Sequence, residues 1–192
     1  ILVAQIINGL VLGMLYVLIA MGMSLVFGLL GIVNFAHGAF VALGAYFALS
    51  MQQKFGWSAV FFAPILAAVV GAAVEVLLIR RTYGRDPLTS LILTFALALL
   101  IEALIRAIWG AAGQQFPVPD MLRGVTIYGA ILVTNYRIAI LVITLIVVVL
   151  VWLLLSRTAF GRILRAGSQD PEMVRMLGIN LPLAMTGAFA LA

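Results

Sequence analysis

The chain has 192 residues, of which 66% are hydrophobic and 9% are charged, and its mean hydropathy is +1.28. These values exclude an ordinary soluble domain and are typical of a polytopic helical membrane protein. The net charge of +5 does not indicate nucleic-acid binding, because most of the basic residues fall in two short loops. The absence of cysteine excludes a disulfide framework and thiol chemistry.

The apolar segments predict an all-α transmembrane helical bundle with five complete spans and the start of a sixth. We expect the spans at residues 4–27, 36–52, 58–79, 88–109 and 138–155, and the sixth from Leu181 onward. A span needs about 20 residues to cross a hydrocarbon core of about 30 Å. Residues 125–133 are rich in β-prone side chains and favour a small hairpin around Gly129.

The first two spans require a break, because residues 1–53 carry no Asp, Glu, Lys or Arg and one helix of that length would measure roughly 80 Å. Residues 28–38 gather three glycines with Asn34 and His37. One interpretation is a turn in which Asn34 caps a helix and Gly38 permits close packing. The other is a broken helix whose polar groups face a solute path. A lone histidine does not predict a metal site.

Two further polar residues within spans are candidates for that path. Asn8 shares one face of the first span with Gly9 and Gly13, whose spacing favours close helix packing as the alternative role. Thr94 belongs to a stripe of hydroxyl side chains that either lines a path or bonds back to helix carbonyls. The candidate translocation path is therefore Asn8, Asn34, His37, Gly38 and Thr94.

The carboxylates within the spans are better explained as structural groups than as proton carriers. Glu75 lies within reach of Arg80, and Glu102 precedes Arg106 by four residues, the favourable order for a partly buried ion pair. The sequence shows no Gly-x-x-x-x-Gly-Lys-Ser/Thr loop, no nucleophile–base pair and no metal-ligand cluster. We therefore predict no enzyme activity, no cofactor and no metal, and any energy from ATP would enter through another subunit.

The loops at residues 80–87 and 156–180 hold seven of the eleven basic residues. Short loops rich in Arg and Lys stay in the cytoplasm, so both loops are predicted to lie there. Alternation of the spans then places the N-terminus outside and residues 34–38 near the cytoplasmic side. If residues 28–38 re-enter the membrane instead of forming a crossing turn, the first span has the opposite orientation.

The loop at residues 156–180 carries the start and stop signals of two short helices. Asp170, Pro171 and Glu172 are typical of a helix start, with an Asp cap, a proline at the first helical position and an acid in the first turn. Gly178 is typical of a helix end. The intervening helix has a large apolar surface, which either lies on the bilayer or docks a soluble partner. Its apolar residues are Met173, Val174, Met176 and Leu177.

The spacing from Glu172 to Gly178 and Ile179 resembles the cytoplasmic "EAA" loop of ABC-transporter permease subunits, although Met173 and Val174 replace the two alanines. The run from residue 160 to residue 180 is similar to the version in permeases for branched-chain amino acids. Residues 28–38 also resemble the N-terminal region of that family, and the likeness extends from about Gln5 to the end of the chain. The resemblance implies that this loop carries a coupling helix that sits in a cleft of an ATPase subunit. The residues it would assign to that loop are Gly161, Arg165, Asp170, Pro171, Glu172 and Gly178.

The resemblance further implies a permease subunit of an ATP-driven importer for branched-chain or hydrophobic amino acids, in the bacterial cytoplasmic (inner) membrane. The chain would form one transmembrane domain over residues 1–192, as the N-terminal fragment of a longer protein. The implied partners are a second related permease, two cytoplasmic ATP-binding subunits, an extracytoplasmic solute-binding protein and membrane lipid, with no nucleic acid. One alternative is a urea or short-amide permease of the same class. Another is a stand-alone secondary transporter or channel, for which Glu75 and Glu102 would be the available coupling groups.

Overall fold

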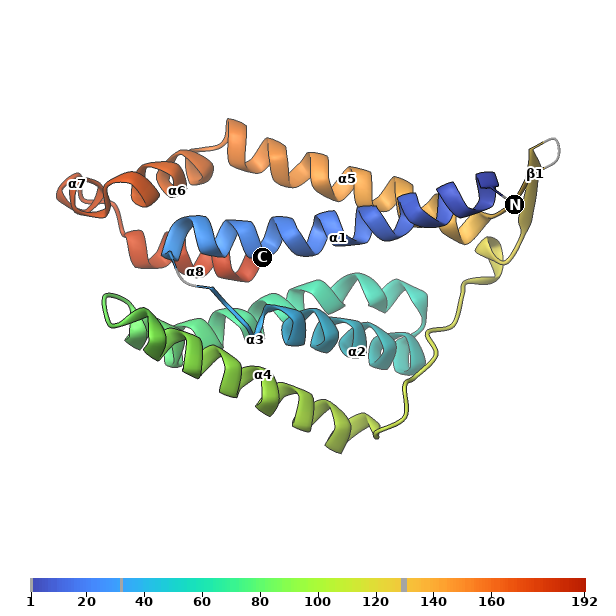
Figure 1. Ribbon diagram of the computed structural model, residues 1–192, viewed down its shortest axis with the longest axis horizontal. Helices are drawn as coiled ribbons and strands as arrows, with labels where there is room; N and C mark the ends of the chain where they lie inside the picture. The colour runs from blue at the N-terminus through green and yellow to red at the C-terminus, as the bar shows by residue number, and fades with distance from the viewer. Residues whose placement is uncertain (1, 32, 129–130) are drawn as a thin grey trace.

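In a computed structural model, the chain forms a helical bundle whose long helices follow one axis (Figure 1). The structure describes residues 2–31, 33–128 and 131–192. The elements are α1 (Leu2–Leu30), α2 (His37–Phe55), the 3₁₀ helix η1 (Trp57–Phe62), α3 (Ala63–Leu77), η2 (Ile79–Thr82), α4 (Pro87–Trp109), η3 (Asp120–Leu122), β1 (Val125–Tyr128), β2 (Ile131–Thr134), α5 (Asn135–Arg157), α6 (Ala159–Gln169), α7 (Pro171–Met176) and α8 (Leu181–Leu191).

Four segments of the described residues are long and apolar enough to cross a membrane, and this confirms the predicted transmembrane helical bundle. They are Gln5–Gly28, Trp57–Thr82, Pro87–Trp109 and Asn135–Arg157. The predicted second span, α2, is not among them, because polar residues lower its hydropathy at both ends, from His37 at its start to Lys54 in its last turn. The predicted sixth span begins at Leu181 as the shorter apolar helix α8.

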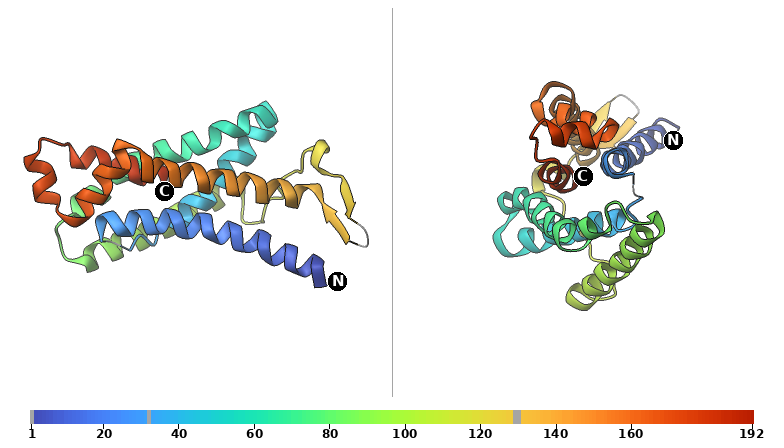
Figure 2. Two further views of the ribbon diagram at one scale, coloured as in Figure 1. Left: turned by 90° about the horizontal axis from the view of Figure 1, so that it is seen from above. Right: turned by 90° about the vertical axis from the view of Figure 1, so that its left-hand side faces the viewer.

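The helices form two groups that α8 joins. In the end-on view, α1 and α5 lie in one group and α2, α3 and α4 lie in the other (Figure 2). Helix α8 contacts α1, α3 and α6. Small residues permit close helix contacts in the bundle. Between α2 and α3, a Cβ at Gly44 would lie 3.6 Å from Ala67 Cβ, and between α3 and α8, a Cβ at Gly71 would lie 3.7 Å from the Phe189 ring. Small residues of α2 and α3 therefore allow these helices to pack closely.

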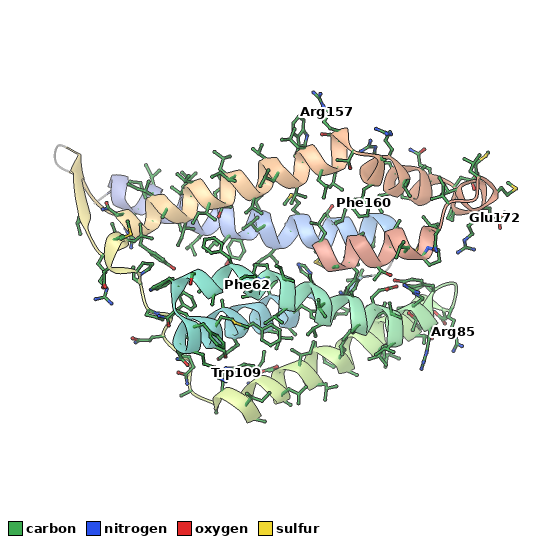
Figure 3. The ribbon with its side chains drawn as sticks, turned by 180° about the vertical axis from the view of Figure 1, so that it is seen from behind. Phe62, Arg85, Trp109, Arg157, Phe160 and Glu172 are labelled. Carbon is green, nitrogen blue, oxygen red and sulfur yellow. The ribbon has the colours of Figure 1, made fainter. Side chains whose placement is uncertain are left out.

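The two basic loops lie at the same end of the molecule, as the predicted topology requires. Arg85 and Glu172 are both at this end, whereas Trp109 lies toward the other (Figure 3). The N-terminal end of α1 and the β1–β2 hairpin lie at the end opposite the basic loops (Figure 1). The hairpin is antiparallel, with Val125 opposite Thr134, which confirms the predicted strands; Gly129 lies outside the described residues.

The chain turns back into the bundle after α1. Helix α1 ends at the basic end, yet α2 starts near the middle of the long axis (Figure 1). His37 Nε2 lies 3.0 Å from the carbonyl oxygen of Ile19, which is eleven residues before the end of α1. At 1.5 Å per residue, that contact is about 16 Å in from the end of α1. The start of α2 therefore lies deeper than alternation of spans predicted, while α1 keeps the predicted orientation relative to the basic loops.

Candidate functional site

Helix α7 and its flanks have the predicted capped geometry. The Asp170 carboxylate accepts a hydrogen bond of 2.9 Å from the backbone N–H of Met173, and Pro171 takes the first helical position. Gly178 has a φ of +76°, in the left-handed region that favours glycine at a helix end. The predicted start and end of this helix are therefore confirmed.

The apolar surface of α7 consists of three exposed side chains. Met173 is 52% exposed, Met176 79% and Leu177 71%, whereas Val174 is buried against the rest of the chain. The sequence interpretation placed Val174 on the apolar surface of the helix, whereas its side chain packs inward and anchors α7. The other three side chains form a patch at the basic end, which we call the α7 apolar patch.

Gly161 and Arg165 join α6 to the end of α5. A Cβ at Gly161 would collide with the carbonyl group of Leu155, so only glycine permits this approach. The Arg165 guanidinium donates to the same Leu155 oxygen. A cation that bonds a carbonyl in the last turn of a helix also complements the helix dipole. These contacts hold α6, the helix before α7, against the last turn of α5.

Asn34 and His37 share a cavity of about 230 Å³ between α2, α3 and α8. Both side chains are at least nine-tenths buried. Asn34 Oδ1 accepts a hydrogen bond of 3.0 Å from the backbone N–H of Ala36, within the turn that precedes α2. Asn34 does not cap that helix, because the N-cap position is Ala36, whose side chain makes no capping hydrogen bond. His37 Nε2 must donate to Ile19, because a carbonyl oxygen only accepts. The rest of the lining is apolar and includes Phe40 and Phe189.

The other candidate path residues lie apart from this cavity. Gly38 lines a separate space of about 530 Å³ between α2 and α4. Thr94 is fully buried and bonds back to the carbonyl oxygen of Leu91 at 3.2 Å, the local alternative that its sequence position allowed. Asn8 lies eleven residues before Ile19 on α1, which is about 16 Å along the helix. The five predicted residues therefore do not form one continuous site.

The intramembrane carboxylates are held by arginines. Glu75 is fully buried and accepts two hydrogen bonds from Arg80, at 3.2 and 3.0 Å, and one of 2.9 Å from Tyr83. Burial raises the pKa of the Tyr83 hydroxyl, and its hydrogen bond to Glu75 raises it further, so the phenol stays protonated and donates. Glu102 pairs with Arg106 as predicted, although both side chains are more than half exposed and the pair is not partly buried.

The sequence profile of a family described as "branched-chain amino acid transport system / permease component" matches residues 5–192. The chain belongs to this family. The family is one of transport components, which agrees with the sequence interpretation that the chain is not an enzyme. Together with the four apolar segments, family membership makes this a multi-pass membrane protein.

Curated relatives carry the same description. The chain is 28% identical over 192 aligned residues to the high-affinity branched-chain amino acid transport system permease protein BraD of Pseudomonas aeruginosa, and 26% identical to LivH of Escherichia coli K12. Each alignment covers 92% of this chain and 62% of the relative. A probable LivH of Methanocaldococcus jannaschii is 30% identical over 184 residues, covering 87% of this chain and 55% of that protein. The chain thus spans less than two thirds of the length of these permeases, and no solved structure matches it.

Sequence reasoning missed several contacts that build the permease fold. A Cβ at Gly22 would lie 2.8 Å from His37 Cε1, so Gly22 makes room for the imidazole. By contrast, a Cβ at Gly9 or Gly13 would meet no atom within 4 Å among the residues that the structure describes. Thr186 of α8 donates to the Glu75 carboxylate at 2.8 Å. Nothing in the local sequence around Thr186 indicates that contact.

Proposed function

We propose that this chain belongs to the permease subunit of an ATP-driven importer that carries branched-chain or other hydrophobic amino acids across the bacterial cytoplasmic membrane. The proposal is supported by the family description and by the printed names of the relatives. Residues 1–192 would form one transmembrane domain, with residues 156–180 as its cytoplasmic coupling loop.

The observation that carries the proposal is the α7 apolar patch. The six-residue helix α7 and the residue that follows it expose three large apolar side chains, which need a partner or a bilayer to cover them. Helix α7 lies beyond the ends of the long helices (Figure 1). This position favours a soluble partner, and an apolar cleft in an ATP-binding subunit fits the helix-in-groove mode of recognition. Glu172 would contact the edge of that cleft.

The cavity beside Asn34 and His37 supports an aliphatic amino acid over urea as the solute. Its lining combines two neutral polar side chains with aromatic and aliphatic groups and no carboxylate. An apolar lining gains free energy from burying a branched aliphatic side chain, whereas urea offers only polar atoms. We propose that Asn34 and His37 contact the solute. Gly38, Asn8 and Thr94 do not line this cavity and are not assigned to the solute contact.

The surface supports assembly with further membrane-embedded chains. Only 6% of the α5 span is buried among the described residues, and its exposed side chains from Val142 to Leu153 are apolar. We propose that lipid and a second related permease cover these faces. Two cytoplasmic ATP-binding subunits would bind the α7 apolar patches, and an extracytoplasmic solute-binding protein would deliver the solute.

A stand-alone secondary transporter has less support. Such a protein needs a group that can release and rebind an ion during the cycle. Glu75 is occupied by three hydrogen-bonding partners and Glu102 is an exposed ion pair. Neither carboxylate lines the cavity of Asn34 and His37.

The proposal is tested by purifying the full-length protein from its native membrane with whatever subunits accompany it. The ATPase activity of the preparation is then measured with leucine, valine and urea, each with the binding protein recovered. We expect ATP-binding subunits in the preparation and turnover stimulated by leucine or valine. Stimulation by urea alone would make urea the solute in place of a hydrophobic amino acid. Transport by a preparation without any ATPase would overturn the assignment to an ATP-driven importer.

A further inference from the structure

The Glu75 carboxylate joins parts of the chain that are far apart in sequence. Its Oε1 atom accepts from Arg80 Nε and Tyr83, and its Oε2 atom accepts from Arg80 Nη2 and from Thr186. Glu75, Arg80 and Tyr83 come from the end of α3 and from η2, whereas Thr186 is 111 residues later on α8. A buried carboxylate is stable only when such partners replace its hydration.

Thr186 also receives a hydrogen bond from Arg80, so the hydroxyl lies between the two charged groups. Its single hydrogen has two acceptors in reach, Glu75 Oε2 at 2.8 Å and the carbonyl oxygen of Pro182 at 3.0 Å. The charged acceptor forms the stronger bond. Arg80 additionally reaches the Pro182 carbonyl at 3.5 Å. The first two turns of α8 are therefore attached to α3 and η2 through polar contacts rather than through apolar packing alone.

The attachment continues into α4. Thr82, in η2, donates to the carbonyl oxygen of Ile79 at 2.7 Å and accepts a hydrogen bond of 2.8 Å from Ser90. Ser90 and Thr82 are both buried. The Thr82–Ser90 contacts and the Glu75 cluster share no hydrogen bond, but the backbone of η2 joins them. Together they form a chain of contacts from α8 through the end of α3 and η2 to the first turn of α4.

Helix α7 lies directly upstream of this chain, since four residues separate its end from the start of α8. The same short connection is anchored at its far end by Leu181, which is fully buried and would meet a Cβ at Gly167 at 2.5 Å. A displacement of α7 therefore pulls on α8 close to Thr186. Interhelical bonds of this kind have discrete made and broken states, which is what coupling between two sites requires.

We propose that Thr186, Glu75 and Arg80 form an interhelical latch that passes movement of α7 to α3 and α4. The proposal rests on the proposed function, because it assigns α7 to the ATPase contact. The three residues act as positioning residues, because they lie outside α7 and do not line the cavity of Asn34 and His37. A purely structural role would instead affect only the amount or stability of the folded protein.

The test uses the assembled transporter with the full-length chain, reconstituted in lipid vesicles. The readout is the number of amino acid molecules taken up per ATP hydrolysed. Thr186→Val removes the hydroxyl at nearly constant shape, and Thr186→Ser keeps it. Thr144→Val makes the same change at a buried threonine of α5 and serves as the matched control.

We expect Thr186→Val to lower uptake per ATP about fivefold or more, because fivefold is near the lower end of typical coupling between two sites. Thr186→Ser and Thr144→Val should keep the parent ratio. An unchanged ratio in Thr186→Val, or equal losses in the valine and serine variants, would overturn the latch while leaving the importer assignment intact. If Thr186→Val does not accumulate, Arg80→Lys replaces it, because lysine keeps the charge but not the two-pronged geometry. A parent complex that hydrolyses ATP without any amino acid uptake would overturn the proposed function itself.

Discussion

Gly161 shows how a single residue sets the position of the cytoplasmic loop. The Leu155 carbonyl lies where a Cβ at residue 161 would be, and the neighbour is backbone that cannot rotate away. Gly161→Ala must therefore push α6 from α5, at a cost of about 1–3 kcal/mol typical of overpacking. We expect a lower thermal unfolding midpoint and less membrane-inserted protein, measured in detergent and by quantifying the membrane fraction.

The matched control for this change is Gly13→Ala on α1. A Cβ there would meet no described neighbour within 4 Å, and alanine is the better helix former by up to about 1 kcal/mol. We expect the midpoint to stay the same or rise. Equal losses in the two variants would show that the effect at Gly161 is not the contact with Leu155.

At the scale of elements, the Asp170 cap stabilises α7, and the size of that stabilisation can be measured directly. Asp170→Ala removes the carboxylate that accepts from the Met173 N–H, which costs about 1 kcal/mol. Since this corresponds to roughly a fivefold change in a local opening equilibrium, amide hydrogen exchange across α7 should accelerate by about that factor. Asp170→Asn keeps an accepting oxygen and should exchange like the parent. If the exchange rate of α7 in Asp170→Ala stays at the parent value, as it should in Asp170→Asn, the capped geometry is contradicted.

Helix α7 is also where the proposed coupling is open to substitution. Glu172 is exposed in the first turn, so its reversal to lysine costs only about 0.3–1 kcal/mol through the helix dipole and leaves the fold intact. We expect Glu172→Lys to lower uptake per ATP about fivefold or more, because it places a cation at the edge of the subunit contact. Gly178→Asp should act similarly, since φ at residue 178 is +76° and a side chain strains the helix end.

The readout for both variants is uptake per ATP in vesicles, with membrane insertion measured in parallel. Glu172→Asp keeps an acid in the first turn and should retain the parent ratio. Normal uptake per ATP in Glu172→Lys and Gly178→Asp would remove the coupling-helix assignment from residues 156–180.

The accuracy of the sequence predictions depended on how local the determining interactions were. Asp170 and Gly178 were read correctly, because a cap and a left-handed glycine act within a few residues. The long spans were found because apolar length is a property of one segment. The depth of the α2 start was misplaced, since it depends on His37 meeting Ile19 of another helix.

Tertiary contacts explain what the sequence did not reveal about the candidate site. The partner of Glu75 on α8 is separated from it by 111 residues, and a threonine in an apolar run has no distinctive spacing. Likewise, Asn34 and His37 share a cavity while Gly38, one residue away, lines another, because consecutive helical residues face different directions. Residue type alone identified the polar side chains within the spans, but it did not indicate which of them lie in contact or share a cavity.

At the scale of the whole molecule, the arrangement predicts which side of the membrane each end occupies. The parent has no cysteine, so single cysteines at chosen sites report accessibility without background. Arg85→Cys and Ser168→Cys lie in the basic loops and should react with a membrane-impermeant maleimide only from the cytoplasmic side. Gln114→Cys and Gln5→Cys belong to the opposite end and should react only from outside.

Gln5 is the decisive position among these, because it tests the orientation of α1 relative to the basic loops. Helix α1 runs toward the basic end, and the chain then turns back into the bundle before α2 (Figure 1). A crossing α1 places residue 5 on the side of residue 114 despite this re-entrant connection. Labelling of Gln5→Cys from the cytoplasmic side, with Gln114→Cys labelled from outside, would mean that α1 enters from the basic end, and the contact between His37 and Ile19 could not exist as described.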